Sequence, residues 1–274
     1  MVALTAWSTE VAPRVGAAGF AVSSVTIDRM TTQVVATSQG RLPAVTAAHR
    51  ADIYRATILK QTALTSLQYV LTRELKLALD SVQPSPALSV MVACGAAGVP
   101  CSSLQYNWCI QDTYAFHGTL APSSEGGLAG FVRAKVAPGL LWCFLRAGCG
   151  TGGGLYCGPS AAAAIERAAP AGWAPPERAT PFLAGLLTGA GGSLATQCVH
   201  NVTLVAGRMA ALGERAQAPH YTTVALRQAW AEMGPAIFYR NFGPRMVINA
   251  FTVAVLSVCD IFASPEVSGW RRRR

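Results

Sequence analysis

Four stretches of the chain carry no charged side chain and dominate its hydrophobic pattern. They cover residues 81–111, 147–165, 179–207 and 246–259. A helix needs about 20 apolar residues to cross the hydrocarbon core of a bilayer. The first and third stretches exceed that length, the second approaches it, and the fourth reaches it only with a flanking arginine extended toward the headgroups. The pattern favours membrane-spanning helices over a very apolar soluble helical protein.

Two further apolar stretches precede these four, which gives six predicted crossings. We place them at residues 11–36, 57–79, 87–110, 146–165, 181–206 and 244–262. Segments rich in Pro, Ser or Gly separate several crossings, because these residues interrupt helices. Amphipathic stretches predict short surface helices near residues 41–52, 128–137 and 222–233.

A short pattern recurs three times along the chain. An arginine follows a bulky residue at Arg55, Arg146 and Arg240, at intervals of 91 and 94 residues. Each arginine is followed 19 or 20 residues later by an acidic residue, at Glu74, Glu166 and Asp260. Two periods that agree indicate three copies of one unit.

The period divides the chain into repeat 1 at residues 1–80, repeat 2 at 81–170 and repeat 3 at 171–265, followed by a basic tail at 266–274. Each repeat is predicted to hold two long helices and one short surface helix. In the fifth crossing, Gly185 and Gly189 form a Gly-x-x-x-Gly pattern. This spacing places small residues on one helix face, so that neighbouring backbones can approach closely.

Composition supports a membrane location. The chain is 51% hydrophobic and only 13% charged, whereas soluble domains carry about 25% charged residues. Its net charge of +9 is one mark of nucleic-acid-binding proteins. Its arginines, however, lie at the edges of apolar stretches, which is typical of anchors that contact anionic lipid headgroups. We therefore expect lipid contacts and no nucleic-acid partner. The tail that begins at Trp270 fits an anchor or an unstructured end equally well, and no cleavable signal peptide is evident.

Candidate chemistry for an enzyme is sparse. The eight cysteines form no Cys-x-x-Cys pattern and mostly lie in apolar stretches, so neither a metal site nor a disulfide framework is predicted. The glycine-rich segment 148–154 lacks the preceding strand and following polar helix of a phosphate-binding loop. The four histidines are scattered, without a triad spacing. We expect no enzyme, no cofactor and no bound metal.

Three segments resemble motifs of the mitochondrial carrier family. Residues 26–31 (TIDRMT) are similar to the Pro-x-Asp/Glu-x-x-Lys/Arg motif at the end of an odd-numbered helix in that family. Residues 234–245 (GPAIFYRNFGPR) are similar to the turn after its short surface helix. Gly185 and Gly189, followed by residues 198–200 (CVH), follow the spacing of its third odd-numbered helix. The resemblance covers nearly the whole chain and is weakest in repeat 2 before Gly139.

This resemblance implies a six-helix bundle with pseudo-threefold symmetry. It further implies a multi-pass location in the mitochondrial inner membrane, with bound cardiolipin or other phospholipid. It also identifies two gates, each of which pairs acidic with basic residues. On the matrix side, the acidic positions hold Asp28, Cys109 and His200, and the basic positions hold Thr31, Asp112 and Thr203.

The cytoplasmic gate is also incomplete. Its acidic positions hold Glu74, Glu166 and Asp260, whereas the basic positions three residues later hold Leu77, Ala169 and Ala263. Neither ring of ion pairs can form as it does in the family. The alternative for the three acids is that they lie at helix ends in headgroup water.

The substrate-contact positions lie about thirteen residues before each cytoplasmic-gate acid, if the family geometry holds. They are Gln61, Gly153 and Val247, with Gly154 beside the second. Val247 cannot supply the cation that the third repeat normally provides. Lys60 and Arg245 are nearby cations that a shift in register would bring into the cavity.

Two functions follow from these observations. The incomplete gates favour a carrier-like protein that no longer transports and serves as an accessory subunit of a larger inner-membrane assembly, such as a respiratory-chain complex. The alternative is a divergent solute carrier that exchanges a small metabolite by alternating access.

Overall fold

The computed structural model describes residues 12–82, 84–120, 127–170, 175–214 and 222–259, and these residues form helices and short connections without any strand. The all-α prediction is therefore confirmed for this part of the chain. The helices are α2 (Ala12–Thr37), α3 (Ala47–Asp80), α4 (Pro86–Gly98), α5 (Cys101–Phe116), α6 (Gly127–Phe131), η2 (Val132–Val136), α7 (Leu140–Leu145), η3 (Arg146–Gly152), α8 (Gly153–Ala168), α9 (Ala179–Ala195), α10 (Gln197–Ala211), α11 (Thr222–Met233), η4 (Gly234–Phe238) and α12 (Phe242–Val258).

Several boundaries follow directly from local sequence. Thr46 caps α3, because its hydroxyl accepts a hydrogen bond from the His49 amide. Pro100 has no amide hydrogen to continue the α4 ladder, and α4 and α5 meet there at an angle of 42°. The break between α9 and α10, at Thr196, is sharper, with an angle of 67°.

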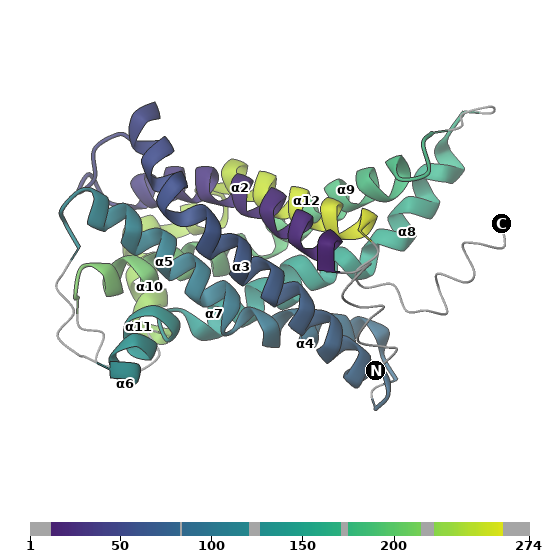
Figure 1. Ribbon diagram of the computed structural model, residues 1–274, viewed down its shortest axis with the longest axis horizontal. Coiled ribbons are helices and arrows are strands. Elements are labelled where there is room, and N and C mark those ends of the chain that lie inside the picture. The colour runs from purple at the N-terminus through teal and green to yellow at the C-terminus, as the bar shows by residue number, and fades with distance from the viewer. Residues whose placement is uncertain (1–11, 83, 121–126, 171–174, 215–221, 260–274) are drawn as a thin grey trace.

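The long helices form a closed ring. Consecutive members pack against one another: α2 on α3, α3 on α4, α4 on η3, α8 on α9 and α9 on α12. Contact between α12 and α2 joins the last helix to the first and closes the ring. At one end α2, α5 and α10 contact one another, near α6 and α11. At the opposite end the α8–α9 and α3–α4 hairpins diverge (Figure 1).

The packing of α9 against α12 involves the predicted Gly-x-x-x-Gly pattern. A Cβ atom on Gly185 would lie 2.5 Å from the Ala254 Cα, and one on Gly189 would lie 2.7 Å from the Ala250 Cα. Only glycine allows α9 and α12 to approach this closely. The expected role of these two residues in helix packing is therefore confirmed.

The structure differs from the predicted elements in repeat 1. Residues 41–52 do not form a separate surface helix, because α3 begins at Ala47 and continues without interruption to Asp80. Near the other two predicted surface helices, the structure has α6 with η2, and α11. Among the described helices, none alone combines the length and hydropathy of a membrane span, whereas the bent pairs α4–α5, α6 to α8 and α9–α10 do so by length and composition.

Candidate functional site

A small pocket lies at the centre of the ring, with a cavity volume of about 70 Å³. Residues of α2, α3, α5, η3 and α12 line it. Its polar lining consists of hydroxyls, amides and two guanidinium groups, contributed by Thr26, Thr65, Gln68, Tyr69, Ser102, Gln105, Tyr106, Arg146, Thr151, Arg245, Asn249 and Thr252. No acidic residue is among the lining residues that the structure describes.

Arg146 enters the pocket from the first position of η3 and is only 5% exposed. Its Nη2 donates a hydrogen bond to the Ser102 hydroxyl, and its Cζ lies 3.5 Å from the centroid of the Tyr106 ring. Its Nη1 has no hydrogen-bond partner among the described residues. A cation over an aromatic face gains about 0.5–2 kcal/mol, which offsets only part of the cost of removing the charge from water.

Arg245 approaches the same pocket from the first turn of α12 and is 3% exposed. Its Nη2 donates to the Thr196 hydroxyl at the break between α9 and α10, while its Nε is buried without a partner in the described part of the chain. Neither Arg245 nor Arg146 forms an ion pair with a described residue. Two buried guanidinium groups therefore line one cavity, and each has a buried nitrogen without a hydrogen-bond partner among the described residues.

Neutral side chains in the pocket are mostly engaged with the protein. Asn249 donates to the Gly189 carbonyl at 2.7 Å and accepts a hydrogen bond from the Thr151 hydroxyl. Gln105 donates to the Thr65 hydroxyl at 2.6 Å. These bonds join α12 to α9 and η3, and α5 to α3. The free hydrogen-bonding capacity of the two arginines is therefore donor capacity, and an anion is the ligand that it suits.

Of the predicted substrate-contact residues, only Arg245 lines the pocket. Arg245 lines the pocket, and so does Ile248, whereas Val247 is 39% exposed on another face of α12. Gln61 is buried between helices and donates to the Gln105 carbonyl at 2.8 Å. Lys60 pairs with Asp112 at 2.7 Å and lies 5.5 Å from the Trp108 ring centroid.

Of the two glycines among those positions, only Gly154 packs against a neighbouring helix. A Cβ atom on Gly154 would meet the Val253 side chain at 3.1 Å, because α8 packs against α12 there. A Cβ atom on Gly153 would have no atom within 4 Å. Neither glycine lines the pocket.

The matrix-gate positions do not form a ring of ion pairs among the described residues. Asp28 pairs with Arg50 at 2.7 Å and contacts Arg29, so both of these cations come from repeat 1. Cys109 is buried in an apolar cluster between α2, α5 and α10. His200 is fully buried, and its Nε2 lies 2.7 Å from the Gln33 Oε1.

The cytoplasmic-gate positions are similarly separated. Glu74 pairs with its neighbour Arg73. Glu166 lies beside Pro175 and Glu177 in a shallow pocket between the end of α8 and the start of α9. Asp260 and Ala263 lie outside the described residues.

The sequence interpretation did not identify Arg146 as a site residue. Its position at the start of an uncharged stretch of nineteen residues led to its assignment as a boundary arginine of the repeat. The available signal was a charge embedded among apolar residues on both sides, LLWCFL before it and AGCG after it. An ionisable residue within a predicted span is by default a functional candidate.

No family of known proteins, no curated protein and no solved structure matches this chain.

Proposed function

We propose that this chain is a divergent, carrier-like membrane protein that binds a small anion in its central pocket and exchanges it by alternating access. The observation that carries the proposal is the pair of buried, carboxylate-free arginines, Arg146 and Arg245, facing one cavity. A charge buried without a counter-ion costs several kcal/mol after relaxation. A bound anion removes that cost, so the pocket is suited to a ligand with negative charge.

The order of the helices supports the carrier-like part of the proposal. Six long helical segments form the ring, namely α2, α3, α4–α5, α7–α8, α9–α10 and α12. Short helices precede the fourth and sixth segments, at α6 with η2 and at α11. This order agrees with the carrier resemblance in repeats 2 and 3. We extend the proposal to three repeats in a lipid bilayer, the mitochondrial inner membrane being the location that the resemblance implies.

The pocket favours an oxyanion as the solute. Guanidinium groups bind carboxylate and phosphate through paired N–H donors, and the Ser, Thr and Gln side chains around them add neutral hydrogen-bonding groups. A cavity of about 70 Å³ accommodates a compact anionic group rather than a large cofactor. The expected class is a small carboxylate or phosphate.

A second candidate is a structural accessory subunit of an inner-membrane assembly. The specific observation in its favour concerns two acidic gate positions, Asp28 and Glu74, which both pair within repeat 1 and not with a cation of another repeat. Such a subunit needs the helical ring but no working gates. The two functions differ in whether Arg146 and Arg245 matter for ligand binding.

Ligand-dependent unfolding of the purified full chain tests the proposal. A panel of phosphate, mono- and dicarboxylates and nucleotides is added in detergent, and the unfolding temperature is measured. We expect at least one anion to raise it, and Arg146→Gln or Arg245→Gln to remove that increase. Arg227→Gln is the matched control, because Arg227 is exposed on α11. If no anion stabilises the wild type, or if the pocket variants respond like Arg227→Gln, the anion-binding proposal fails.

A further inference from the structure

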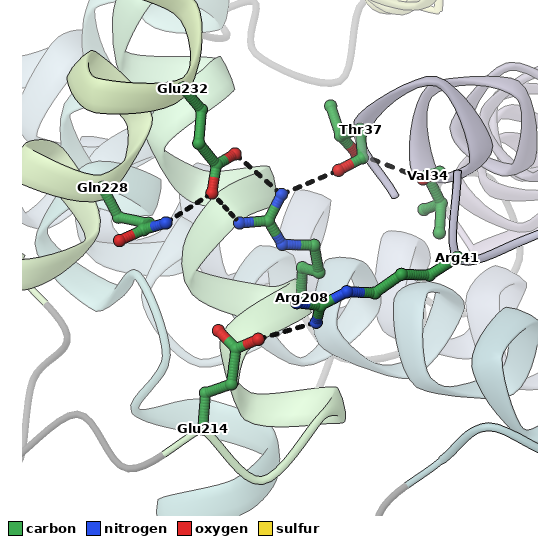
Figure 2. Close-up of polar contacts among 7 residues, drawn as sticks. All are labelled: Val34, Thr37, Arg41, Arg208, Glu214, Gln228 and Glu232. Carbon is green, nitrogen blue, oxygen red and sulfur yellow. Dashed lines mark hydrogen bonds and ion pairs between the residues drawn. The ribbon is translucent and has the colours of Figure 1, made fainter. Parts of the chain in front are cut away.

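The carboxyl end of α2 is held by arginines that lie far along the chain. Arg208 of α10 donates to the Thr37 carbonyl at 2.8 Å, and Arg240, just before α12, donates to the Ala36 carbonyl at 3.0 Å. The last carbonyls of a helix have no partner within the helix. Two guanidinium groups from repeat 3 therefore cap the end of the first long helix. Figure 2 shows the Arg208 contact.

Arg208 has a second, stronger set of contacts. It is 4% exposed and pairs with both carboxylate oxygens of Glu232 on α11, with one of these bonds at 2.8 Å. Gln228 donates to the same carboxylate at 2.7 Å and fixes its orientation (Figure 2). The bidentate geometry makes this the firmest kind of ion pair. Arg208, Glu232 and Gln228 all belong to α10 and α11, so this pair keeps its charge balance if α2 moves.

The contacts of Arg208 with Thr37 and with Glu232 therefore differ in the free energy needed to break them. Release of the Thr37 carbonyl breaks one hydrogen bond to a charged donor, and water can replace it at a helix end. Separation of Arg208 from Glu232 would leave two poorly solvated charges, which costs more free energy than the loss of that single hydrogen bond. At Arg208, the contact with α2 is thus weaker than the contact with Glu232.

An exposed ion pair and a buried core accompany this boundary. Arg41, just after α2, pairs with Glu214 at 2.7 Å, and both side chains are partly exposed (Figure 2). Beneath lies an apolar cluster in which Val34 and Leu42 meet Leu204, with Cys109 buried at 1% exposure. This cluster fills the end of the ring where α2, α5 and α10 converge. Movement of the end of α2 would expose it.

We propose that the carboxyl end of α2 is the opening element at this end of the ring, and that Arg208, held in place by Glu232, is its latch. The proposal rests on the proposed alternating-access function, because only a protein that exchanges solute needs this end to open. The latch differs from a ring of ion pairs between helices, since it uses a cation and the terminal carbonyls of a helix. It offers a closing contact in a chain whose acid and base positions cannot form that ring.

The reactivity of Cys109 tests the latch without knowledge of the solute. The full chain is placed in lipid nanodiscs, treated with a water-soluble thiol reagent, and labelling of each cysteine is measured by mass spectrometry. The test variant is Arg208→Gln with Glu232→Gln, which removes the latch and leaves no unpaired charge. We expect Cys109 to be labelled at least tenfold faster in this variant, with Cys94 and Cys143 unchanged.

Internal controls are present in the same molecule. Cys94 and Cys143 are buried outside the α2–α5–α10 cluster, whereas Cys149 and Cys157 are exposed. Arg227→Gln is expected to label like the wild type. Unchanged labelling of Cys109 in the double variant would overturn the latch. So would a parallel rise at Cys94 and Cys143, because the pair would then support the whole fold.

Anion binding separates the latch from the proposed function. If the double variant exposes Cys109 selectively while no anion stabilises the wild type, the end opens as inferred but the proposed solute site is wrong. If an anion stabilises the wild type through Arg146 and Arg245 while Cys109 remains protected in the double variant, the solute site is supported and the latch is overturned.

Discussion

A buried guanidinium without a carboxylate partner destabilises the protein that contains it, because its charge has lost water and gained no counter-ion. Arg245 contributes such a cost unless an anion is bound. Loss of the hydrogen bond from Arg245 would not leave the Thr196 hydroxyl without a partner, because that hydroxyl also donates to the Gly192 carbonyl at 2.7 Å. At the residue scale, Arg245 should therefore increase the affinity for an anion and decrease the stability of the ligand-free protein.

We expect Arg245→Met to raise the free energy of unfolding of the ligand-free protein by about 1–3 kcal/mol. The same substitution should abolish the increase in unfolding temperature that anions cause in the wild type. Denaturant unfolding with and without anion provides the measurement, with Arg227→Met as the exposed control. A loss of stability on Arg245→Met would instead assign the arginine a purely structural role.

The Glu232 carboxylate should make stability depend on pH. Its burial alone would raise its pKa, but hydrogen bonds from Arg208 and Gln228 outweigh burial, so the pKa lies below its ordinary value of about 4.5. A carboxylate with a lowered pKa contributes stability that is present above the unfolded-state pKa and is lost as pH falls through the folded-state pKa. We expect the difference in unfolding free energy between wild type and Glu232→Gln to be constant above about pH 6 and to shrink as the pH falls towards about 3. A constant difference over this range would contradict the assigned shift.

At the element scale, the approach of α9 to α12 depends on the absence of side chains at two glycines. We expect Gly189→Ala to destabilise the protein by about 1–3 kcal/mol, because the new methyl group meets backbone atoms 2.7 Å away. Gly191→Ala, on the open side of the same helix, should stabilise it by about 0.5–1 kcal/mol through helix propensity. Denaturant unfolding of both variants measures the contrast, and equal effects would contradict this packing.

The sequence predicted where helices form better than it predicted which face of each helix points into the pocket. The expected surface helix at 222–233 coincides with α11, because its buried apolar positions, Ala225, Ala229 and Met233, recur at helical spacing. In repeat 1, an N-cap at Thr46 and the absence of Pro or Gly through residue 80 merge the predicted surface helix with α3. Counting along α12 selected Val247, but two residues correspond to about 200° of rotation, and Arg245 faces the pocket instead.

At the scale of the whole molecule, the ring brings together residues that no local pattern connects. Arg146 and Arg245 are 99 positions apart and line one pocket, and Arg240 reaches the end of α2 across 204 positions. Closure of the ring by α12 against α2 produces both arrangements. Composition and spacing predicted the helices, whereas the identity of the pocket residues depends on how the ring closes.

Uptake into vesicles tests the function of the intact ring. The purified chain is reconstituted in phospholipid vesicles, and entry of the radiolabelled anion that gives the largest stabilisation is followed with time. We expect saturable uptake that falls at least tenfold in Arg146→Gln and in Arg245→Gln and persists in Arg227→Gln, because only the first two remove a charge from the pocket. Uptake that is equal in all variants would exclude the central pocket as the route. Absence of uptake, combined with firm association with other membrane proteins through more than about 1,000 Å² of interface, would instead support the structural subunit.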